Sequence, residues 1–459
     1  MQRLRWIERH PKAWRVAAAA LFAVACATVP AIAVKHRDLG HDVLGPNDGW
    51  AAVGSGTTGG SLAAPDQIYV VTNRRELIAA LNNGVPSSTS PSNPSNIPKI
   101  IYVDGEIEGN VDDDNNPLTC DDYNRNGYTL EAYLAAYDPA VWGRKLPSGP
   151  LESARVASQQ AQQARVRIRI GSNTTIVGVD NKATLEGVWL DIRGTTGPVV
   201  NRTNVVVRNL RLHDTFDCFP QWDPTDGATG NWNSQYDNIS LRNADHIWID
   251  HNDFADVQTA DQSLPFFFGR IFQVHDGELD ITNASNYVTV SWNQFREHDK
   301  VMLIGSSDSA TADRGLLKIT LHHNLFENVS QRTPRVRFGQ VHVYNNYYVI
   351  KNNPNYVYTW GVGVESAIYA QNNFFRTSPD VTPDRIISRL NGTAIITLDT
   401  LLNAASDNHS IDVRAEYNAV NDPDLTDAVG WTPTLVAEFD ETFKVPSRIK
   451  SRAGPFNWQ

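Results

Sequence analysis

The segment Ile319-Thr320-Leu321-His322-His323-Asn324-Leu325-Phe326 carries the pattern that decides the fold. Apolar residues stand at the first and third positions of this segment, an asparagine stands at the sixth and an aromatic residue at the eighth. Four other segments repeat this pattern around Asn252, Asn293, Asn346 and Asn373. An earlier segment has the same strand pattern with Leu210 in the asparagine position.

The intervals between these asparagines are 41, 31, 22 and 27 residues. Short alternating strands at a spacing near 22 residues are typical of the coils of a parallel β-helix, and longer intervals indicate inserted loops. Alternate apolar side chains would point inward, from coils about 4.8 Å apart. Asparagine tolerates the left-handed backbone of a sharp corner, and its amide can bond to the next coil. We therefore predict an all-β, single-stranded solenoid in which the repeated asparagine and aromatic residues are structural.

The flanks of the repeat have a different composition. Leu130 to Tyr137 and Glu152 to Arg165 have helical periodicity. Because the open ends of a solenoid expose strand edges, we assign residues 34–170 to an N-terminal cap with short helices and to early coils. The stretch after Pro379 is expected to cover the other end. Nothing resembles a linker, so residues 34–459 are predicted to form one domain.

The first 33 residues have the layout of a secretory signal peptide. A basic start precedes an apolar run from Val16 to Val29, and Ala31-Ile32-Ala33 offers a cleavage site. The run is short for a membrane span, which needs about 20 residues. A lipid anchor at Cys26 fits the neighbouring residues poorly. We expect a secreted protein, free of the membrane after cleavage.

Charge and cysteine content restrict the class of partner. The chain has a net charge of −11, and removal of residues 1–33 makes it more acidic. An acidic surface argues against nucleic acid as the partner. Cys120 and Cys218 are the cysteines that remain after cleavage. They could form a disulfide in an exported protein or stay as two buried thiols, and the sequence leaves both open.

Several charged residues occupy similar positions in successive coils. Counted back from the asparagine of its own coil, Asp237 lies 15 residues away, Asp280 13 and Arg332 14. Lys300 also falls at 15 if nine residues of the polar stretch 306–314 are an inserted loop. These residues should then share one face of the solenoid, where inserted loops commonly carry function.

Acidic residues in this group have the chemistry of a calcium site. Asp276 lies four residues before Asp280, within reach of Asp237. Three carboxylates without a nearby cysteine or histidine pair suit Ca²⁺, although ordinary surface acids remain the alternative. Basic residues follow in the stretch 331–339, where Arg335 and Arg337 share a strand face. A solvated loop or a salt-bridge network would also account for these arginines.

Four ordered motifs resemble polysaccharide lyase family 1, and most closely the extracellular pectate lyases of the bacillus type. They are Ile247-Trp248-Ile249-Asp250-His251, Asp276-Gly277-Glu278-Leu279-Asp280, His298-Asp299-Lys300 and Gln331-Arg332-Thr333-Pro334-Arg335-Val336-Arg337. Further similar stretches, among them residues 38–41, 47–50, 219–227, 232–237 and 430–433, extend the resemblance over nearly all of the chain after residue 33.

The resemblance implies a right-handed parallel β-helix that cleaves polygalacturonate by calcium-dependent β-elimination. It implies that Asp237, Asp276 and Asp280 hold Ca²⁺ and that Arg332 is the catalytic base. An alkaline optimum is expected, since arginine releases its proton only in alkaline solution. We expect a monomer that cuts within the polymer.

Lys300 and Arg337 match the residues that bind substrate carboxylates in that family and support catalysis. Asp226 could help to hold a further Ca²⁺, and the less familiar stretch Gln258 to Phe268 could alter the substrate cleft. A pectin lyase is a poorer reading because it would lack the three acids. A polygalacturonase would use paired carboxylates and water, and a β-helical adhesin would need no arginine–lysine–calcium group.

Overall fold

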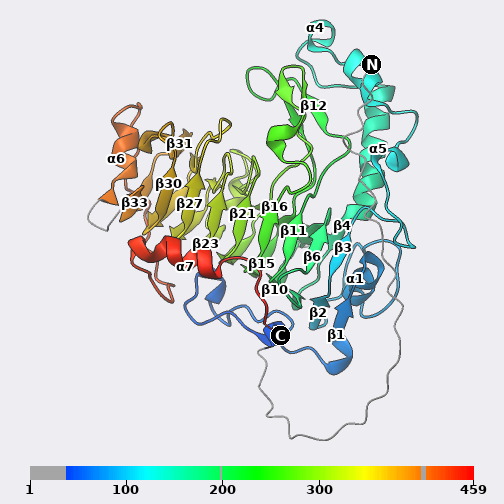
Figure 1. Cartoon of the computed structure of the whole chain (residues 1–459), viewed down its shortest axis with the longest axis horizontal. Helices are drawn as coiled ribbons and strands as arrows, with labels where there is room; N and C mark the ends of the chain where they lie inside the picture. The colour runs from blue at the N-terminus through cyan, green and yellow to red at the C-terminus, as the bar shows by residue number, and fades with distance from the viewer. Residues whose placement is uncertain (1–37, 197–198, 405–409, 459) are drawn as a thin grey trace, which may run out of the picture.

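The structure, a computed structural model, describes residues 38–196, 199–404 and 410–458. The predicted signal peptide lies outside these residues. Successive coils stack along the long axis of the molecule (Figure 1), and each coil adds one strand to each of three parallel sheets. The fold is a right-handed parallel β-helix, as the sequence and the resemblance indicated.

The three sheets run side by side along the solenoid. Sheet 1 contains β1 (Ile68–Val71), β2 (Lys99–Val103), β5 (Thr174–Gly178), β10 (Arg202–Arg208), β15 (Ala244–Asp250), β20 (Asn286–Ser291), β23 (Lys318–His322), β26 (Gln340–Tyr344), β29 (Ala367–Gln371) and β32 (Ile395–Leu398). Sheet 2 contains β3 (Glu106–Glu108), β6 (Thr184–Glu186), β11 (Arg211–His213), β16 (Asp253–Ala255), β21 (Gln294–Arg296), β24 (Leu325–Glu327), β27 (Tyr347–Ile350), β30 (Phe374–Thr377), β33 (Thr400–Leu402) and the antiparallel β34 (Ser410–Ile411). Sheet 3 contains β4 (Arg167–Arg169), β7 (Trp189–Arg193), β14 (Ile239–Arg242), β19 (Leu279–Thr282), β22 (Leu303–Ile304), β25 (Arg335–Val336), β28 (Trp360–Gly363) and β31 (Ile387–Leu390).

An asparagine ladder marks the corner between sheets 1 and 2, as predicted. The side-chain Nδ2 of Asn252 donates to Oδ1 of Asn293 at 3.0 Å, and the same bond joins Asn293 to Asn324 at 3.1 Å. It continues from Asn324 to Asn346 at 3.0 Å and from Asn346 to Asn373 at 3.2 Å. Each Oδ1 also accepts the main-chain N–H of the asparagine one coil earlier. The ladder therefore satisfies buried polar groups that a sharp corner would otherwise leave unpaired.

The left-handed residue at this corner differs from the expectation. The expectation that the ladder asparagines themselves take this conformation was wrong, because the residue before each of them does so. These residues are His251, Trp292, His323, Asn345 and Asn372, with φ of 49–56°. The ladder asparagine must keep its amide inside the corner, and the preceding residue makes the turn.

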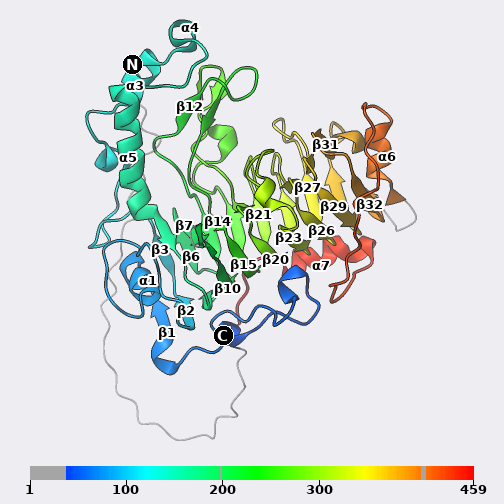
Figure 2. The ribbon, with the colours of Figure 1, turned by 180° about the vertical axis from the view of Figure 1, so that it is seen from behind.

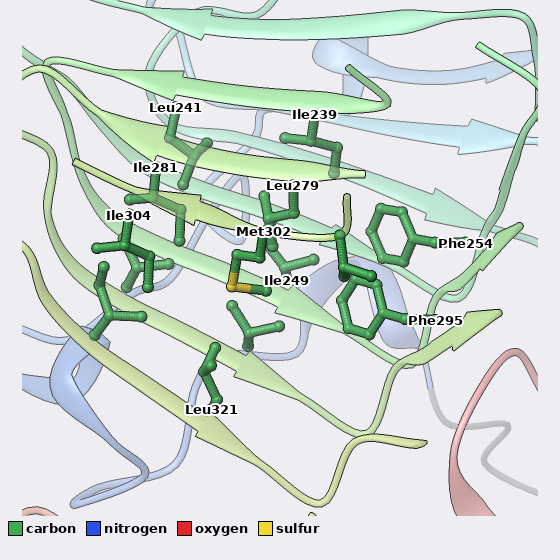
Figure 3. Close-up of a cluster of buried hydrophobic side chains, with 14 of the residues drawn as sticks. Ile239, Leu241, Ile249, Phe254, Leu279, Ile281, Phe295, Met302, Ile304 and Leu321 are labelled. Atoms are coloured by element: carbon green, nitrogen blue, oxygen red, sulfur yellow. The ribbon is translucent and has the colours of Figure 1, made fainter. Parts of the chain in front are cut away.

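Aromatic rings stack inside the solenoid two residues after the ladder. The rings of Phe254, Phe295, Phe326, Tyr348 and Phe375 follow one another with centroids 4.4–5.1 Å apart and planes within 9° of parallel. Aliphatic residues of the other two sheets fill the remaining interior (Figure 3), and those labelled there are fully buried. Removal of this surface from water stabilises the coils by roughly 25 cal/mol per Å².

Helices cover the N-terminal end of the solenoid. The predicted helices appear as α3 (Leu130–Ala136) and α5 (Pro150–Val166), with α1 (Arg74–Leu81), α2 (Cys120–Tyr123) and α4 (Pro139–Trp142) beside them in sequence. The long helix α5 crosses this end of the molecule in both views (Figures 1 and 2). A disulfide between Cys120 and Cys218 joins α2 to the loop after β11, which settles the choice that the sequence left open.

The chain ends lie elsewhere than expected. Residues 38–67 are not part of the cap, because they run over the outer face of sheet 1, where the N–H of Trp50 donates to Oγ1 of Thr320. The solenoid continues beyond Pro379 through β31, β32 and β33, and α6 (Val413–Asn418) follows at that end. The remaining chain, with α7 (Val445–Arg452), returns along the outside, so that Trp458 Nε1 bonds to Gly178 O (Figure 1). None of the helices in the described ranges has the length and apolar character to cross a bilayer.

We predict that Asn324→Ala lowers the unfolding free energy by about 1–3 kcal/mol, because it leaves buried donors and acceptors in two neighbouring coils unpaired. The midpoint of urea unfolding would measure the loss. Asn355→Ala, in an exposed turn, serves as the control. Equal midpoints for the two variants would contradict a stabilising role for the ladder.

Candidate active site

The predicted site lies where the chain enters sheet 3. The segments 214–238 and 256–278 connect sheet 2 to sheet 3 and include the hairpins β12 (Gln221–Asp223)–β13 (Asn231–Asn233) and β17 (Phe266–Phe267)–β18 (Arg270–Ile271). Buried aromatic residues, among them Trp222, Trp232 and Phe272, hold these two segments together. Asp237 and Asp276 stand at the ends of these segments, so the rigid coil fixes their positions.

Two of the three predicted acids lie on either side of one glycine. Oδ1 of Asp237 accepts the N–H of Gly277 at 3.0 Å, and Oδ1 of Asp280 accepts the N–H of Leu303 at 2.9 Å. A Cβ at Gly277 would stand 2.7 Å from Oδ1 of Asp280 and 3.1 Å from Oδ1 of Asp237. Gly277 therefore keeps open the space between the two carboxylates. Ser240 donates a further, short hydrogen bond to Asp237.

Burial and mutual repulsion raise the pKa values of two of these acids, Asp237 and Asp280. Burial raises the pKa of Asp237 well above its ordinary value, and the charges of Asp280 and Asp276 raise it further. Burial and the charge of Asp276 raise the pKa of Asp280 to about 7, although Arg332 opposes this shift. A buried cluster of this kind is destabilised in its charged form unless a cation neutralises it.

The register of sheet 3 refines the counting from the asparagines. Ile239 pairs with Leu279, so Gly277 occupies the position of Asp237, and Gly277 in turn bridges to Lys300. The inserted loop of that coil is 305–317, between β22 and β23, as assumed for Lys300. Asp280 was expected in the same position, but it pairs with Ser240, three residues further along. The pairing between these two coils is offset by one residue in sheet 3 relative to sheet 1. A count from the asparagine corner cannot show this offset.

Three arginines line the next coil. Arg332 follows Gln331, the bridge partner of Lys300, and Arg335 pairs with Leu303 in β25. The Nε atoms of Arg332 and Arg335 are buried without a hydrogen-bond partner in the structure. Burial lowers the pKa of Arg335, and the charges of Arg337 and Arg332 add to the shift. Arg332 and Arg335 therefore each keep a buried donor without a partner, and Arg332 is close enough to Asp280 to oppose the rise of its pKa.

Arg337 is already held by the protein. Its Nε donates to Oδ1 of Asp308 at 2.6 Å, and its Nη1 donates to the carbonyl of Gly305 at 2.9 Å. Asp308 belongs to the loop 305–317 and is also bonded by Asn391. A substrate carboxylate would have to share Arg337 with Asp308.

The three predicted acids are not among the tightest clusters of possible metal ligands. Within the described ranges, ligand atoms lie within 4.8 Å of one another in two groups, Asp214–Asp256–His275 and Asp256–Asp261–His298. In these groups Nδ1 of each histidine lies 2.7–2.9 Å from a carboxylate oxygen, so the carboxylates already bind imidazole protons. Asp226 lies in the exposed turn of the β12–β13 hairpin, where Asn231 donates to it.

The chain resembles known pectate lyases in family, sequence and structure. The family model described as pectate lyase matches residues 149–422. The chain is 47% identical to the pectate lyase of Bacillus subtilis strain 168 over 421 residues, which cover 91% of this chain and 94% of that protein. The chain belongs to the pectate lyase family. It is thus an enzyme of the polysaccharide lyase class, and the resemblance to bacillus-type pectate lyases is confirmed.

Solved structures of pectate lyases agree with this assignment. A thermostable pectate lyase is 47% identical and superimposes with a TM-score of 0.85 over 92% of this chain and all of that one. A pectate lyase bound to a hexasaccharide is 44% identical, with a TM-score of 0.83 over the same shares of the two chains. Pectate lyases cleave pectate by β-elimination, so the rival hydrolase and adhesin interpretations fall away.

Sequence reasoning missed several residues around the site. Ser240 could have been found from strand alternation, since it shares the outward face of its strand with Arg242. Asp308 lies in the polar stretch 306–314 that the sequence marks as an inserted loop, but no sequence pattern pairs it with Arg337. Asp261 belongs to the less familiar stretch, and only the folded chain brings it beside His275.

We predict that Asp280→Asn stabilises the calcium-free protein in alkaline solution. The raised pKa means that the stability present below about pH 4 is lost as the pH rises through about 7. Asparagine removes the charge and keeps an oxygen for the Leu303 N–H. In EDTA at pH 8 the variant should melt a few degrees higher than the parent, about the shift expected for 1 kcal/mol.

Near pH 4 the two melting temperatures should converge, because Asp280 is then protonated in the folded parent. Asp66→Asn, on an exposed residue of the N-terminal segment, controls for the general effect of net charge. A lower melting temperature for Asp280→Asn at pH 8 would show that the carboxylate is not repelled in the free site.

Proposed function

We propose that the chain is a secreted, calcium-dependent pectate lyase that cleaves (1→4)-α-D-galacturonan, with Arg332 as the base. The observation that carries the proposal is the pair of mutually repelling carboxylates of the buried Asp237 and the half-buried Asp280 around Gly277, beside Arg332 with an unpaired Nε. Asp276 adds a third charge to this pair. Products would be 4,5-unsaturated oligogalacturonates released by cuts within the polymer.

The donor set suits a hard divalent cation. Asp237, Asp276 and Asp280 offer carboxylate oxygens, which Ca²⁺ prefers, and a bound cation would oppose the upward pKa shifts of Asp237 and Asp280. Gly277 leaves room where any other residue would place a Cβ. These three aspartates would hold the ion. Bound there, it would neutralise the galacturonate carboxylate and so make the neighbouring C5–H bond more acidic.

The protein's own residues would then carry the elimination. Arg332, in its neutral form, takes the C5 proton. The electron pair of that bond forms the C4–C5 double bond, and the C4–O bond breaks with its electron pair on the oxygen of the leaving chain, which takes a proton from water. Lys300 and Arg337 would bind the substrate carboxylate and stabilise the charge that develops beside C5. Arg337 could do so with Nη2 while Nε stays on Asp308.

The sequence also supports a proposal for where the enzyme acts and with which partners. Residues 1–33 would direct export and be removed, and residues 34–459 would act as a single catalytic domain outside the cell. The enzyme would work as a monomer on pectate, without nucleic acid or membrane as a partner. The acidic charge of the chain argues against nucleic acid as a partner, and Lys300, Arg332 and Arg337 supply the local positive charge that an anionic polymer needs.

The decisive assay follows the ultraviolet absorbance of the unsaturated product from polygalacturonate. We expect absorbance to grow in the presence of Ca²⁺, to stop with EDTA, to return with excess Ca²⁺ and to be fastest in alkaline buffer. Reducing ends without this absorbance would indicate hydrolysis. Undiminished activity in EDTA would remove the proposed role of the three aspartates.

Arg332→Lys tests the base. Lysine keeps the positive charge but cannot place a guanidine nitrogen at C5, so we expect kcat to fall by at least about a thousandfold, within the range attributed to general bases and transition-state contacts. KM for polygalacturonate should change little. Arg376→Lys, on an exposed residue, provides the matched control. A kcat close to the parent value would exclude Arg332 as the base.

A further inference from the structure

A buried group of two aspartates and two histidines lies next to the proposed metal site. Asp256 follows β16, Asp261 begins a short 3-10 helix (Asp261–Ser263), His275 precedes Asp276, and His298 follows β21. The side chains of all four are at most 4% exposed. None of these residues has a role in the elimination described above. We call this group the aspartate–histidine quartet.

Two hydrogen bonds and a further close contact join the acids of the quartet to its imidazoles. Nδ1 of His298 lies 2.7 Å from Oδ2 of Asp256, and Nδ1 of His275 lies 2.9 Å from Oδ1 of Asp261 and 3.2 Å from Oδ2 of Asp256. Each imidazole of the quartet therefore contacts a buried carboxylate, and each carboxylate contacts an imidazole. Buried polar groups paired in this way fix the geometry of their partners, because a displaced partner would leave a buried group without a hydrogen bond.

Two hydrogen bonds lead from the quartet into the active site. Nε2 of His298 lies 2.9 Å from the main-chain carbonyl oxygen of Asp276 and can donate to it. Oδ2 of Asp261 accepts the N–H of Asp299, which immediately precedes Lys300, at 3.0 Å. Asp299 in turn accepts two hydrogen bonds from Gln331, which immediately precedes Arg332. The quartet therefore contacts the main chain at Asp276 and beside Lys300, and it reaches the neighbour of Arg332 only through Asp299.

We propose that the aspartate–histidine quartet is a positioning network that sets the main chain of Asp276, and through Asp299 that of Lys300, and so determines calcium affinity. The inference rests on the proposed function, since it assumes that Asp276 binds the ion. It assigns a role to the less familiar stretch 258–268, which supplies Asp261. Residues that orient metal ligands through a second hydrogen bond commonly change metal affinity about 10- to 100-fold when removed.

Two substitutions of His298 separate its two bonds. The amide nitrogen of asparagine can replace Nδ1 of histidine, and that of glutamine can replace Nε2. His298→Asn thus keeps the bond to Asp256 and loses the bond to Asp276. His298→Gln keeps the bond to Asp276 and loses the bond to Asp256. The calcium Kd of the full chain, measured by calorimetry at one fixed pH, is the readout.

We expect His298→Asn to weaken the calcium Kd about tenfold and His298→Gln to weaken it by about threefold or less. The matched control is His246→Asn, because His246 has the same bonding pattern on sheet 1, with Nδ1 on Asp245 and Nε2 on the carbonyl of Val53. It should leave the Kd unchanged. A lower melting temperature with the parent Kd in His298→Asn would assign the quartet a merely structural role and overturn the proposal.

Asp261→Asn supplies the same readout if His298→Asn does not fold, and we expect it to weaken the Kd several-fold. An unchanged Kd in that variant would also overturn the proposal. Asp237→Asn distinguishes this inference from the function on which it rests. Calcium binding in Asp237→Asn equal to that of the parent would refute the metal site itself, and the role of the quartet would fall with it.

Discussion

The pairing of each coil with the next is the constraint on which the rest of the molecule depends. Because main-chain hydrogen bonds fix the spacing between coils, a side chain on one coil meets the side chains at the same register position on its neighbours. Inside the core, the asparagine ladder and the aromatic stack both result from this alignment of equivalent positions. The active site is the same rule on the outside, where Asp237, Gly277 and Lys300 occupy one register position on three successive coils.

The register also explains how unfavourable charges can be held together. Asp237 and Asp280 come from different coils, and each accepts a main-chain N–H that the sheet has already placed. The free energy of coil stacking opposes their repulsion, so the site can remain assembled with its carboxylates partly protonated. The carboxylates that would bind a cation therefore lower the stability of the cation-free fold, a trade-off that is common at functional sites.

The periodicity of the sequence was sufficient to predict the structural features that recur from coil to coil. The positions of Asn324 and Phe326 within their coil, and the loop that brings Lys300 into phase, all followed from counting. Counting already placed Asp280 two residues from the position of Asp237, and a register shift of one residue, invisible without the neighbouring strand, makes the offset three. Pairs such as Arg337 with Asp308 could not be predicted, since both residues are charged, common in type and separated by 29 residues. The return of the C-terminal segment was missed for a related reason, because it has no repeat to count.

That returning segment changes what kind of solenoid this is. In an open repeat protein each coil touches only its neighbours, and end coils can fray one at a time. Here Gly454 bonds to Trp292, and Phe456 bonds to Asn209, while residues 38–67 reach across the same sheet from the other end of the chain. Residues 454–458 thus bond to coils as far as 280 positions earlier in the sequence. These contacts join coils that are not neighbours, so the solenoid gains a cooperativity that its repeats alone do not provide.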